Sequence, residues 1–367
     1  MVKRVLLLGG GHAHAYVLRV LIGEPLADVQ LTLVTPYDKH CYSGMLPGLV
    51  AGHYALEDVQ IDVARLAKAA GVEVVRAAVT QLDAAARRVQ LSSGETLEYD
   101  IASLNLGSLP NTNLVRGSAE HTLAAKPFED FLEGWNALLA RRAGAADDVL
   151  RVALVGAGAA GVELAMAIAY RFAALGRKAQ VTLYSDRPMF APPIARRVYA
   201  ALARSGVQLR EPEAVSAIEP GGVVVARSSR TRYDAVIWTA GAAPLPWLRA
   251  TGLETDAAGF VLVDEMLRST SHPEVFAAGD CATLRDAPHP KSGVYAVRHG
   301  DWLARNLRYA LAEVPPHRYR PQRRALALIS CGERNAIADW SGWSAEGAWA
   351  WRWKDWLDRR WVRGFVL

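Results

Sequence analysis

Cysteine is scarce in this sequence, and its cysteines are not paired. Cys41, Cys281 and Cys331 are the only three in 367 residues, and no two of them lie close along the chain. Small secreted domains held by disulfides, and zinc sites built from cysteine pairs, need several cysteines at short spacings. Disulfide reductases need two redox cysteines a few residues apart. The sequence therefore argues against these three classes and favours a reducing, cytoplasmic compartment.

Long hydrophobic runs are also missing. A membrane-spanning helix needs roughly 18 or more apolar residues in succession, whereas the longest candidate, residues 152–170, contains Glu163 and several glycines. The apolar run that opens the chain is broken at Gly9, too early for the core of a signal peptide. A net charge of +5 with dispersed basic residues does not mark a nucleic-acid-binding protein. We therefore expect a globular chain of two or three domains with no nucleic-acid partner.

A glycine-rich turn in the middle of the chain is typical of a dinucleotide-binding fold. The β-branched run 152–155 is followed by Gly156, Gly158 and Gly161 in the spacing GxGxxG, then by an alanine-rich helical pattern and a second strand at 180–184. In such a unit the first glycine allows the tight turn, the second lets the pyrophosphate approach, and the third lets the helix pack on the strand. The segment predicts a nucleotide-binding βαβ unit.

The N-terminal segment is a variant of the same unit. A strand is predicted at 3–8, Gly9 and Gly11 occupy the first two glycine positions, and His14 replaces the third. This replacement predicts either a helix set further from the strand or an imidazole near the phosphates. His12 and His14 have too few neighbouring ligands for a metal ion, so no metal site is expected.

An internal repeat joins the two units. Residues 99–107 read YDIASLNLG and residues 233–241 read YDAVIWTAG, with the same spacing from the tyrosine to Gly107 or Gly241. Two repeated dinucleotide-binding folds imply two dinucleotides. The chemistry that requires two is hydride transfer between a nicotinamide and a flavin.

A third element resembles a known family. Near the C-terminus a strand runs into Gly279 and Asp280, within HPEVFAAGDCATL. With this turn the chain resembles the FAD-dependent pyridine nucleotide-disulfide oxidoreductase superfamily. Within it the sequence is similar to type II NADH dehydrogenases, to sulfide:quinone reductases and most of all to the flavoprotein module found alone or fused to selenide, water dikinase. The residues that carry this likeness read GGGHAH, LTLVTPYDKHCYSGMLPGLVAGHY, AAKPFEDF, GDCATL, PKSGVYAVRHGDWLARNL and WRWKDWLDRRWVRGF.

The resemblance implies an α/β protein with two Rossmann-like domains, the second inserted in the first. The expected divisions are an FAD-binding domain from residues 1–116 and 252–330, an NAD(P)H-binding domain from 117–251, and a tail from 331–367.

It also implies roles for single residues. Gly9, Gly11, His12 and His14 are expected at the FAD pyrophosphate, and Ser43 and Gly44 at the flavin. Val79 is expected at the adenine and Asp280 at the ribityl chain. Two lysines, Lys126 and Lys291, match family lysines near the flavin face and are the expected catalytic residues. In the second unit Glu163 is expected on the nicotinamide side.

The sequence departs from the usual adenosine-binding pattern in both units. An acidic residue commonly ends the second strand and binds the ribose, but Thr35 stands there in the first unit, with Asp38 nearby. In the second unit Ser185 stands there, beside Asp186 and Arg187, and this leaves the choice between NADH and NADPH open.

The tail is rich in tryptophan and basic residues. Seven of the eleven tryptophans follow residue 339, and Trp353, Trp356, Leu357 and Trp361 recur at helical spacing. Such a helix suits a membrane interface, and the resemblance implies peripheral contact with the cytoplasmic face of a membrane. The alternatives are that the stripe packs on the FAD domain or on a second copy in a homodimer.

The expected function is an FAD-dependent NAD(P)H dehydrogenase that passes electrons to an acceptor, with a quinone favoured. The glutamine-bearing motif typical of type II NADH dehydrogenases is replaced here by KSGVYAVRHG. This replacement argues against a quinone as the acceptor. One alternative is an oxidoreductase acting on sulfide or selenium species through Cys41 or Cys331. The other is a flavin-bearing redox sensor with slow turnover.

Overall fold

The first of two similar sheets is built from both ends of the chain. The computed structural model describes residues 2–141, 149–225, 230–315, 317–322, 326–340 and 342–367. Five parallel strands form the sheet, in the order β19 (Val275–Ala277), β9 (Ile101–Leu104), β1 (Lys3–Leu8), β2 (Val29–Val34) and β5 (Glu73–Val75). Its middle strands are almost wholly buried and apolar, as parallel strands covered on both faces require.

Helices α1 (His12–Gly23) and α9 (Gly293–Leu311) pack against each other beside this sheet. Val17, Leu18 and Leu21 lie on the buried stripe of α1. The two helices come so close that a side chain at Gly300 would overlap Tyr16, and the glycine allows this approach.

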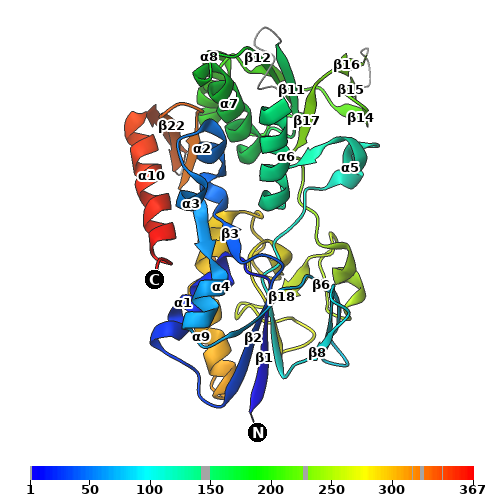
Figure 1. Ribbon diagram of the computed structural model, residues 1–367, viewed down its shortest axis with the longest axis vertical. Helices are drawn as coiled ribbons and strands as arrows, with labels where there is room; N and C mark the ends of the chain where they lie inside the picture. Colours follow the sequence, from blue (N-terminus) through cyan, green and yellow to red (C-terminus); the bar gives the residue numbers. More distant parts are fainter. Residues whose placement is uncertain (1, 142–148, 226–229, 316, 323–325, 341) are drawn as a thin grey trace.

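The second sheet repeats the first. Its parallel strands lie in the order β10 (Leu123–Ala124), β17 (Ala235–Trp238), β11 (Leu150–Val155), β12 (Ala179–Tyr184) and β13 (Gln208–Arg210). In both sheets the strand before the glycine turn, β1 or β11, lies between the next strand of its βαβ unit and the strand of the tyrosine repeat. The turn is therefore at the point where the chain reverses direction across the sheet, which is where open α/β sheets bind ligands. Figure 1 shows the first unit in the lower part of the molecule and the second in the upper part.

The expected fold is confirmed. The predicted strands at 3–8, 29–34, 152–155 and 180–184 correspond to β1, β2, β11 and β12. The second unit is an insertion, because β19 returns to pair with β9 of the first sheet.

Helices and short sheets complete the two units. The remaining helices are α2 (Leu46–Ala51), α3 (Leu56–Val59), α4 (Val63–Ala69), α5 (Ser118–His121), α6 (Phe128–Arg141), α7 (Ala159–Ala174) and α8 (Pro192–Arg204). The short sheets pair β3 (Lys39–Cys41) with β4 (Gln60–Asp62), β6 (Val79–Asp83) with β7 (Arg88–Leu91) and β8 (Thr96–Glu98), β14 (Val215–Glu219) with β15 (Gly222–Val225) and β16 (Thr231–Arg232), and β18 (Val261–Val263) with β20 (Ala282–Leu284).

The C-terminal segment forms a small sheet and a helix. β21 (Ala327–Ser330), β22 (Ala336–Trp340) and β23 (Trp343–Gly347) pair antiparallel, and α10 (Ala348–Arg363) follows. Ile329 and Ile337 of this sheet share a hydrophobic core with α7, and so does Val50 of α2. Parts of the first unit and of the tail are therefore packed into the second unit. Figure 1 shows α10 on the outside of the molecule.

Two glycines of the second turn differ in the space around them: Gly161 is closely packed, whereas Gly158 faces open space. A Cβ at Gly161 would overlap the carbonyl oxygen of Gly156 and lie 2.8 Å from Thr239 Oγ1. We expect Gly161→Ala to lower the free energy of unfolding by about 1–3 kcal/mol, because the helix must move away from the strand. Gly158→Ala is the matched control, since no atom lies within 4 Å of its added Cβ. Urea denaturation measures both, and equal losses would contradict the prediction.

Candidate functional site

The first glycine turn lies directly against the end of β9. Gly9 has φ +96°, and a Cβ there would lie 2.6 Å from the carbonyl oxygen of Asn105. A Cβ at Gly11 would overlap the Asn105 side chain. Only glycine fits at these positions, and the turn is a cradle of bare backbone at the start of α1.

Asn105 shapes this cradle, and the sequence analysis missed it. Its Oδ1 accepts the N–H groups of Ala13 (3.0 Å) and His14 (3.2 Å), and its Nδ2 donates to Ala278 O at 2.8 Å. A helix start leaves four N–H groups without intrahelical partners. Asn105 accepts the N–H groups of Ala13 and His14. The two other N–H groups, of Gly11 and His12, belong to the cradle. The signal was the polar residue in SLNLG, where the second repeat has WTAG.

His14 fills the space that the third glycine leaves open in other such turns. The ring is fully buried; its Nδ1 donates to Gly9 O at 2.6 Å, and its Nε2 lies 2.8 Å from Ser103 Oγ. Burial lowers the pKa of His14 to about 4. Both ring nitrogens are thus used within the protein, between α1 and β9, and the expected contact of His14 with the pyrophosphate stays a prediction.

His12 lies at the mouth of the cradle. Its Nδ1 is 3.3 Å from His40 Nε2 of β3, and its ring packs on Tyr42 with centroids 5.3 Å apart. Burial lowers the pKa of His12 well below its ordinary value, and the charges of His40 and Lys126 lower it further. Among the described residues its Nε2 has no hydrogen-bond partner.

Asp280 and Lys126, which are far apart in the sequence, form an ion pair in the structure. Lys126 Nζ lies 2.8 Å from Asp280 Oδ2, and Ser108 Oγ donates to the same oxygen at 3.2 Å. Gly279, with φ +72°, donates its N–H to His299 Nδ1 at 3.0 Å. The carboxylate is therefore held beside the end of β9, close to the glycine cradle.

Ser43 and Gly44 lie at the N-terminus of α9. They belong to the 3₁₀ turn η1 (Ser43–Met45), and a Cβ at Gly293 would come within 2.9 Å of Ser43 Oγ. A Cβ at Gly44 would meet the Tyr42 ring at 2.9 Å. The start of a helix carries a partial positive charge, so this end of the site suits an anionic ring system.

Lys291 is packed inside the protein. Its Nζ donates to Ala282 O and to Thr283 Oγ1 (2.7 Å), and it lies 4.1 Å from the centre of the Phe260 ring. Burial lowers its pKa. It is therefore not a solvated surface charge, and its expected role at the flavin stays a prediction.

The remaining predicted FAD residues lie at strand ends and turns. Thr35 Oγ1 donates to Tyr37 O at 3.2 Å, Asp38 pairs with Arg76 at 2.7 Å, and Val79 is buried at the start of β6. Gly107 has φ +73° and an open position for a Cβ. None of these contacts tests the expected role in binding.

The second glycine turn has the same construction. Gly156 has φ +111° and a Cβ there would lie 2.7 Å from Ala240 N, while Gly241, at φ +67°, follows in the neighbouring loop. At the end of β12 Ser185 Oγ donates to Arg187 O at 2.6 Å. Asp186 and Arg187 are exposed.

Glu163 faces the tail. Its Oε1 accepts the N–H of Ser330 at 2.8 Å, and burial raises its pKa, against the effect of the nearby Lys354. The contact links α7 of the second unit to β21. The expected place on the nicotinamide side stays a prediction.

Lys354 of α10 reaches back to the η1 turn that contains Gly44. Its Nζ donates to Gly44 O and to Asp358 Oδ2, both at 2.6 Å. Burial opposes its charge, but Asp358 and Glu163 raise the pKa of Lys354 above the ordinary value. Asp358 also accepts a hydrogen bond from Tyr42. The sequence analysis did not single out this cluster, because its members come from three separate segments.

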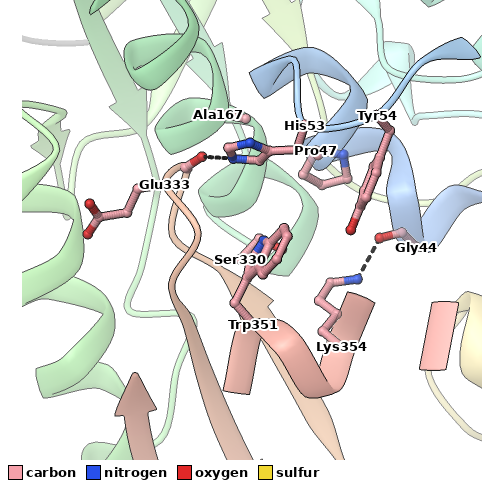
Figure 2. A pocket seen from close by; sticks show the side chains of 11 residues that line it. Gly44, Pro47, His53, Tyr54, Ala167, Ser330, Glu333, Trp351 and Lys354 are labelled. Atoms are coloured by element: carbon pink, nitrogen blue, oxygen red, sulfur yellow. Dashed lines mark hydrogen bonds between the residues drawn. The ribbon is translucent and has the colours of Figure 1, made fainter. Parts of the chain in front are cut away.

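A small pocket adjoins this cluster. Figure 2 shows Lys354 directed at Gly44, with Tyr54 and Trp351 beside it and His53 on the opposite wall. His53 Nε2 is hydrogen-bonded to Gly332 O at 2.8 Å. The cavity measures about 10 Å³, enough for roughly one water molecule.

The cysteines lie in separate places. Cys41 is buried in the core of the first unit and Cys331 in that of the second, and all three cysteines are free thiols. Burial raises the pKa of Cys41 to about 11 and that of Cys331 to about 12. At neutral pH these groups are therefore thiols rather than the nucleophilic thiolates.

The tryptophan stripe of α10 is partly packed against the protein and partly exposed to solvent. Trp361 packs on the first core, 6.3 Å from the Tyr16 ring. Trp353, Trp356 and Leu357 are exposed by 39%, 53% and 37%. Within the described residues, no helix is both long enough and apolar enough to cross a membrane.

Comparison with known proteins places this arrangement in a family. The model of the pyridine nucleotide-disulphide oxidoreductase family matches residues 3–300. An NADH dehydrogenase-like protein of Bacillus subtilis is 26% identical over 78% of this chain and 78% of its own length. A type II NADH:quinone oxidoreductase of Staphylococcus saprophyticus is 25% identical, over 86% of this chain and 85% of its own. A demethylphylloquinone reductase of Synechocystis is 27% identical, over 90% and 85%.

A solved structure shows the same fold. The sulfide:quinone oxidoreductase of Aquifex aeolicus superposes with a TM-score of 0.80, covering 99% of this chain and 92% of that one, at 19% identity. At this identity the likeness concerns the fold alone.

Removing the buried cation of α10 should be costly. Lys354→Met leaves the Asp358 carboxylate, 10% exposed, without its partner, and we expect the free energy of unfolding to fall by about 3–5 kcal/mol. Arg352→Met is the matched control, because Arg352 is an exposed cation on the same helix; it should cost less than about 0.5 kcal/mol.

The pH dependence follows from the raised pKa of Lys354. Its stabilisation is fully present below the unfolded-state pKa of lysine and is lost as pH rises through the higher folded-state pKa. The difference between wild type and Lys354→Met should therefore stay constant between about pH 7 and 9. A difference that disappears in this range would show that the pair does not stabilise the fold.

Proposed function

The chain belongs to the pyridine nucleotide-disulphide oxidoreductase family, and from this premise we propose that it transfers hydride from NADH or NADPH to FAD and passes the electrons to a quinone. The observation that carries the proposal is the pair of sheets with the same strand order, each with a glycine turn at its switch point. We assign FAD to residues 1–116 and 252–330 and the nicotinamide nucleotide to residues 117–251.

The first unit fits FAD. Gly9 and Gly11 leave backbone bare where a pyrophosphate would lie, and the unpartnered His12 Nε2 is a further polar group there. We assign Asp280 to the ribityl hydroxyls; its carboxylate contacts Lys126 and Ser108. When bound, FAD supplies the hydride acceptor and the electron donor. The protein's residues bind it, orient it and exclude water.

We place the electron acceptor beside Gly44 and α10. The pocket next to Lys354 is the place where the flavin-side turn, the second unit and the tail meet. Its small volume means that a quinone ring can enter only if the side chains of Tyr54 or Trp351 move. Lys354 is a cation there that can stabilise negative charge on a reduced quinone oxygen.

The alternative chemistry with sulfide or selenium species gains no support from the thiols. Cys41 and Cys331 are buried in different cores, and burial raises both pKa values. A sulfur-transferring flavoprotein needs accessible thiolates near the flavin. The quinone therefore remains the favoured acceptor over these species. The rate at which a quinone reoxidises the flavin distinguishes the dehydrogenase from the slow redox sensor.

Anaerobic stopped-flow spectroscopy tests the function. NADH or NADPH should bleach the long-wavelength absorption of bound FAD, and a soluble quinone should restore it. In Lys354→Met the recovery should slow about tenfold more than the bleaching, because the cation stabilises charge only in the acceptor half-reaction, whereas its contacts between the two units bear on both phases. Arg352→Met should match the wild type in both phases.

Three outcomes would contradict the proposal in different ways. If neither nucleotide bleaches the flavin, the second glycine turn does not hold a hydride donor. Bleaching without recovery by quinone indicates the redox sensor, and equal slowing of both phases in Lys354→Met removes the assignment of the acceptor to its pocket.

We propose further that the exposed face of α10 rests on a membrane surface. Trp349, Trp353 and Trp356 are exposed by 41%, 39% and 53%, and the cations Arg352 and Arg360 lie among them. Exposed tryptophan beside arginine suits the boundary between lipid headgroups and acyl chains.

Vesicle sedimentation tests this contact. The protein should bind vesicles that contain anionic phospholipid, and the double variant Trp353→Ser/Trp356→Ser should lose most of the binding because two anchoring rings are gone. The control is Leu114→Ser/Leu175→Ser, which removes two exposed apolar side chains elsewhere. Unchanged binding of the tryptophan variant overturns the proposal. A dimer that the same variant converts to monomer also overturns it, and would assign this face to a second copy.

A further inference from the structure

Two histidines from different segments meet beside the FAD cradle. His12 is the first residue of α1, and His40 lies in the middle of β3, paired with Ile61 of β4. Their Nδ1 and Nε2 atoms are 3.3 Å apart, and the rings are nearly perpendicular at 87°. Burial, with a smaller effect of the nearby Lys126 charge, lowers the pKa of His40 to about 4. Both rings are therefore neutral near pH 7, and one N–H group is shared between them.

The direction of this hydrogen bond decides what His12 presents to a ligand. If His40 Nε2 carries the proton, it donates to His12 Nδ1, and the proton of His12 is then on Nε2. If His12 Nδ1 carries the proton, His12 Nε2 is a bare lone pair. Next to a phosphate oxygen a bare lone pair repels, whereas an N–H donates a hydrogen bond.

The surroundings of His12 favour an anion at its free nitrogen. The Nε2 atom is buried without a partner among the described residues, and His12 is only 7% exposed. A buried polar atom without a partner is costly unless a ligand or water completes it. The same residue begins α1, whose first N–H groups point out of the helix. His12 thus offers two groups for an anion, its backbone N–H and its ring Nε2.

We propose that His40 is a positioning residue for FAD: it donates from Nε2 to His12 Nδ1 and so holds His12 in the tautomer whose Nε2–H donates to a pyrophosphate oxygen. His40 itself does not touch the cofactor. Tyr42 also packs on the His12 ring, with centroids 5.3 Å apart, and limits its rotation. The inference rests on the proposed function only through FAD, and neither the hydride donor nor the electron acceptor enters it.

A double-mutant cycle on FAD release tests the coupling. The purified holoprotein is diluted, and the rise in fluorescence of free FAD gives the release rate. His40→Phe should speed release about tenfold, because His12 Nδ1 loses its donor inside the protein. His40→Gln should stay close to wild type, since its amide N–H can take the place of Nε2–H.

The second arm of the cycle replaces His12. His12→Gln keeps an N–H near the position of Nε2 but has no acceptor at the position of Nδ1. In this background His40→Phe should add no further effect. Equal acceleration by His40→Phe in both backgrounds overturns the proposal, as does an unchanged rate in the single variant.

A measurement on the unmodified holoprotein is independent of variant folding. Nitrogen-15 NMR of labelled histidine distinguishes protonated from bare ring nitrogens, and His12→Gln identifies the signal of His12. We expect His12 to carry its proton on Nε2 and not on Nδ1; the opposite assignment overturns the proposal. A protein reduced normally by NADH but without coupling in the cycle overturns this inference alone, whereas a protein that retains no FAD overturns it together with the proposed function.

Discussion

The buried ammonium of Lys354 is the contact on which the relation between the parts of this molecule depends. It joins α10 to the η1 turn through Gly44 O, and Asp358 and Glu163 provide the negative charge that keeps the ammonium protonated. Glu163 belongs to the second unit and also holds the N–H of Ser330. Hydride transfer requires the two nucleotides in direct contact, within a few tenths of an ångström of the reactive geometry. A charge cluster shared by both units and the tail fixes the two sheets relative to each other.

Local pattern was sufficient to predict the two units. Strands β1 and β11 are short apolar runs that end in glycine, and their turns follow from steric rules that apply within a few residues. The tyrosine repeat predicted the neighbouring strands β9 and β17, because it placed the same residues at the same distance before Gly107 and Gly241. The return of β19 to the first sheet could not be derived from periodicity. It was expected only because the turn at Gly279 and Asp280 resembles that of known flavoproteins.

The contacts that complete the site were not predictable in the same way. Asn105, just after β9, and His40 of β3 contact the start of α1 from other segments of the chain, and both are ordinary polar residues in their local context. Lys126 was expected near the flavin, but its pairing with Asp280 depends on how the chain crosses between the units. His14 was recognised as a departure from the glycine pattern. Only the structure shows that Ser103 and Gly9 satisfy both nitrogens of its ring.

The tail combines two requirements that usually conflict. A helix that touches a surface must expose apolar side chains, whereas a helix that closes an active site must bury its own contacts. α10 separates them by face: Asp358 and Val362 are buried, while Trp353 and Trp356 are exposed. Because the pocket beside Lys354 holds about one water molecule, an acceptor ring that enters it must displace Tyr54 or Trp351, and Trp351 belongs to α10. The same helix therefore contributes both to the outer surface and to one wall of the space beside Gly44, and its Lys354 contacts oppose movement of that wall.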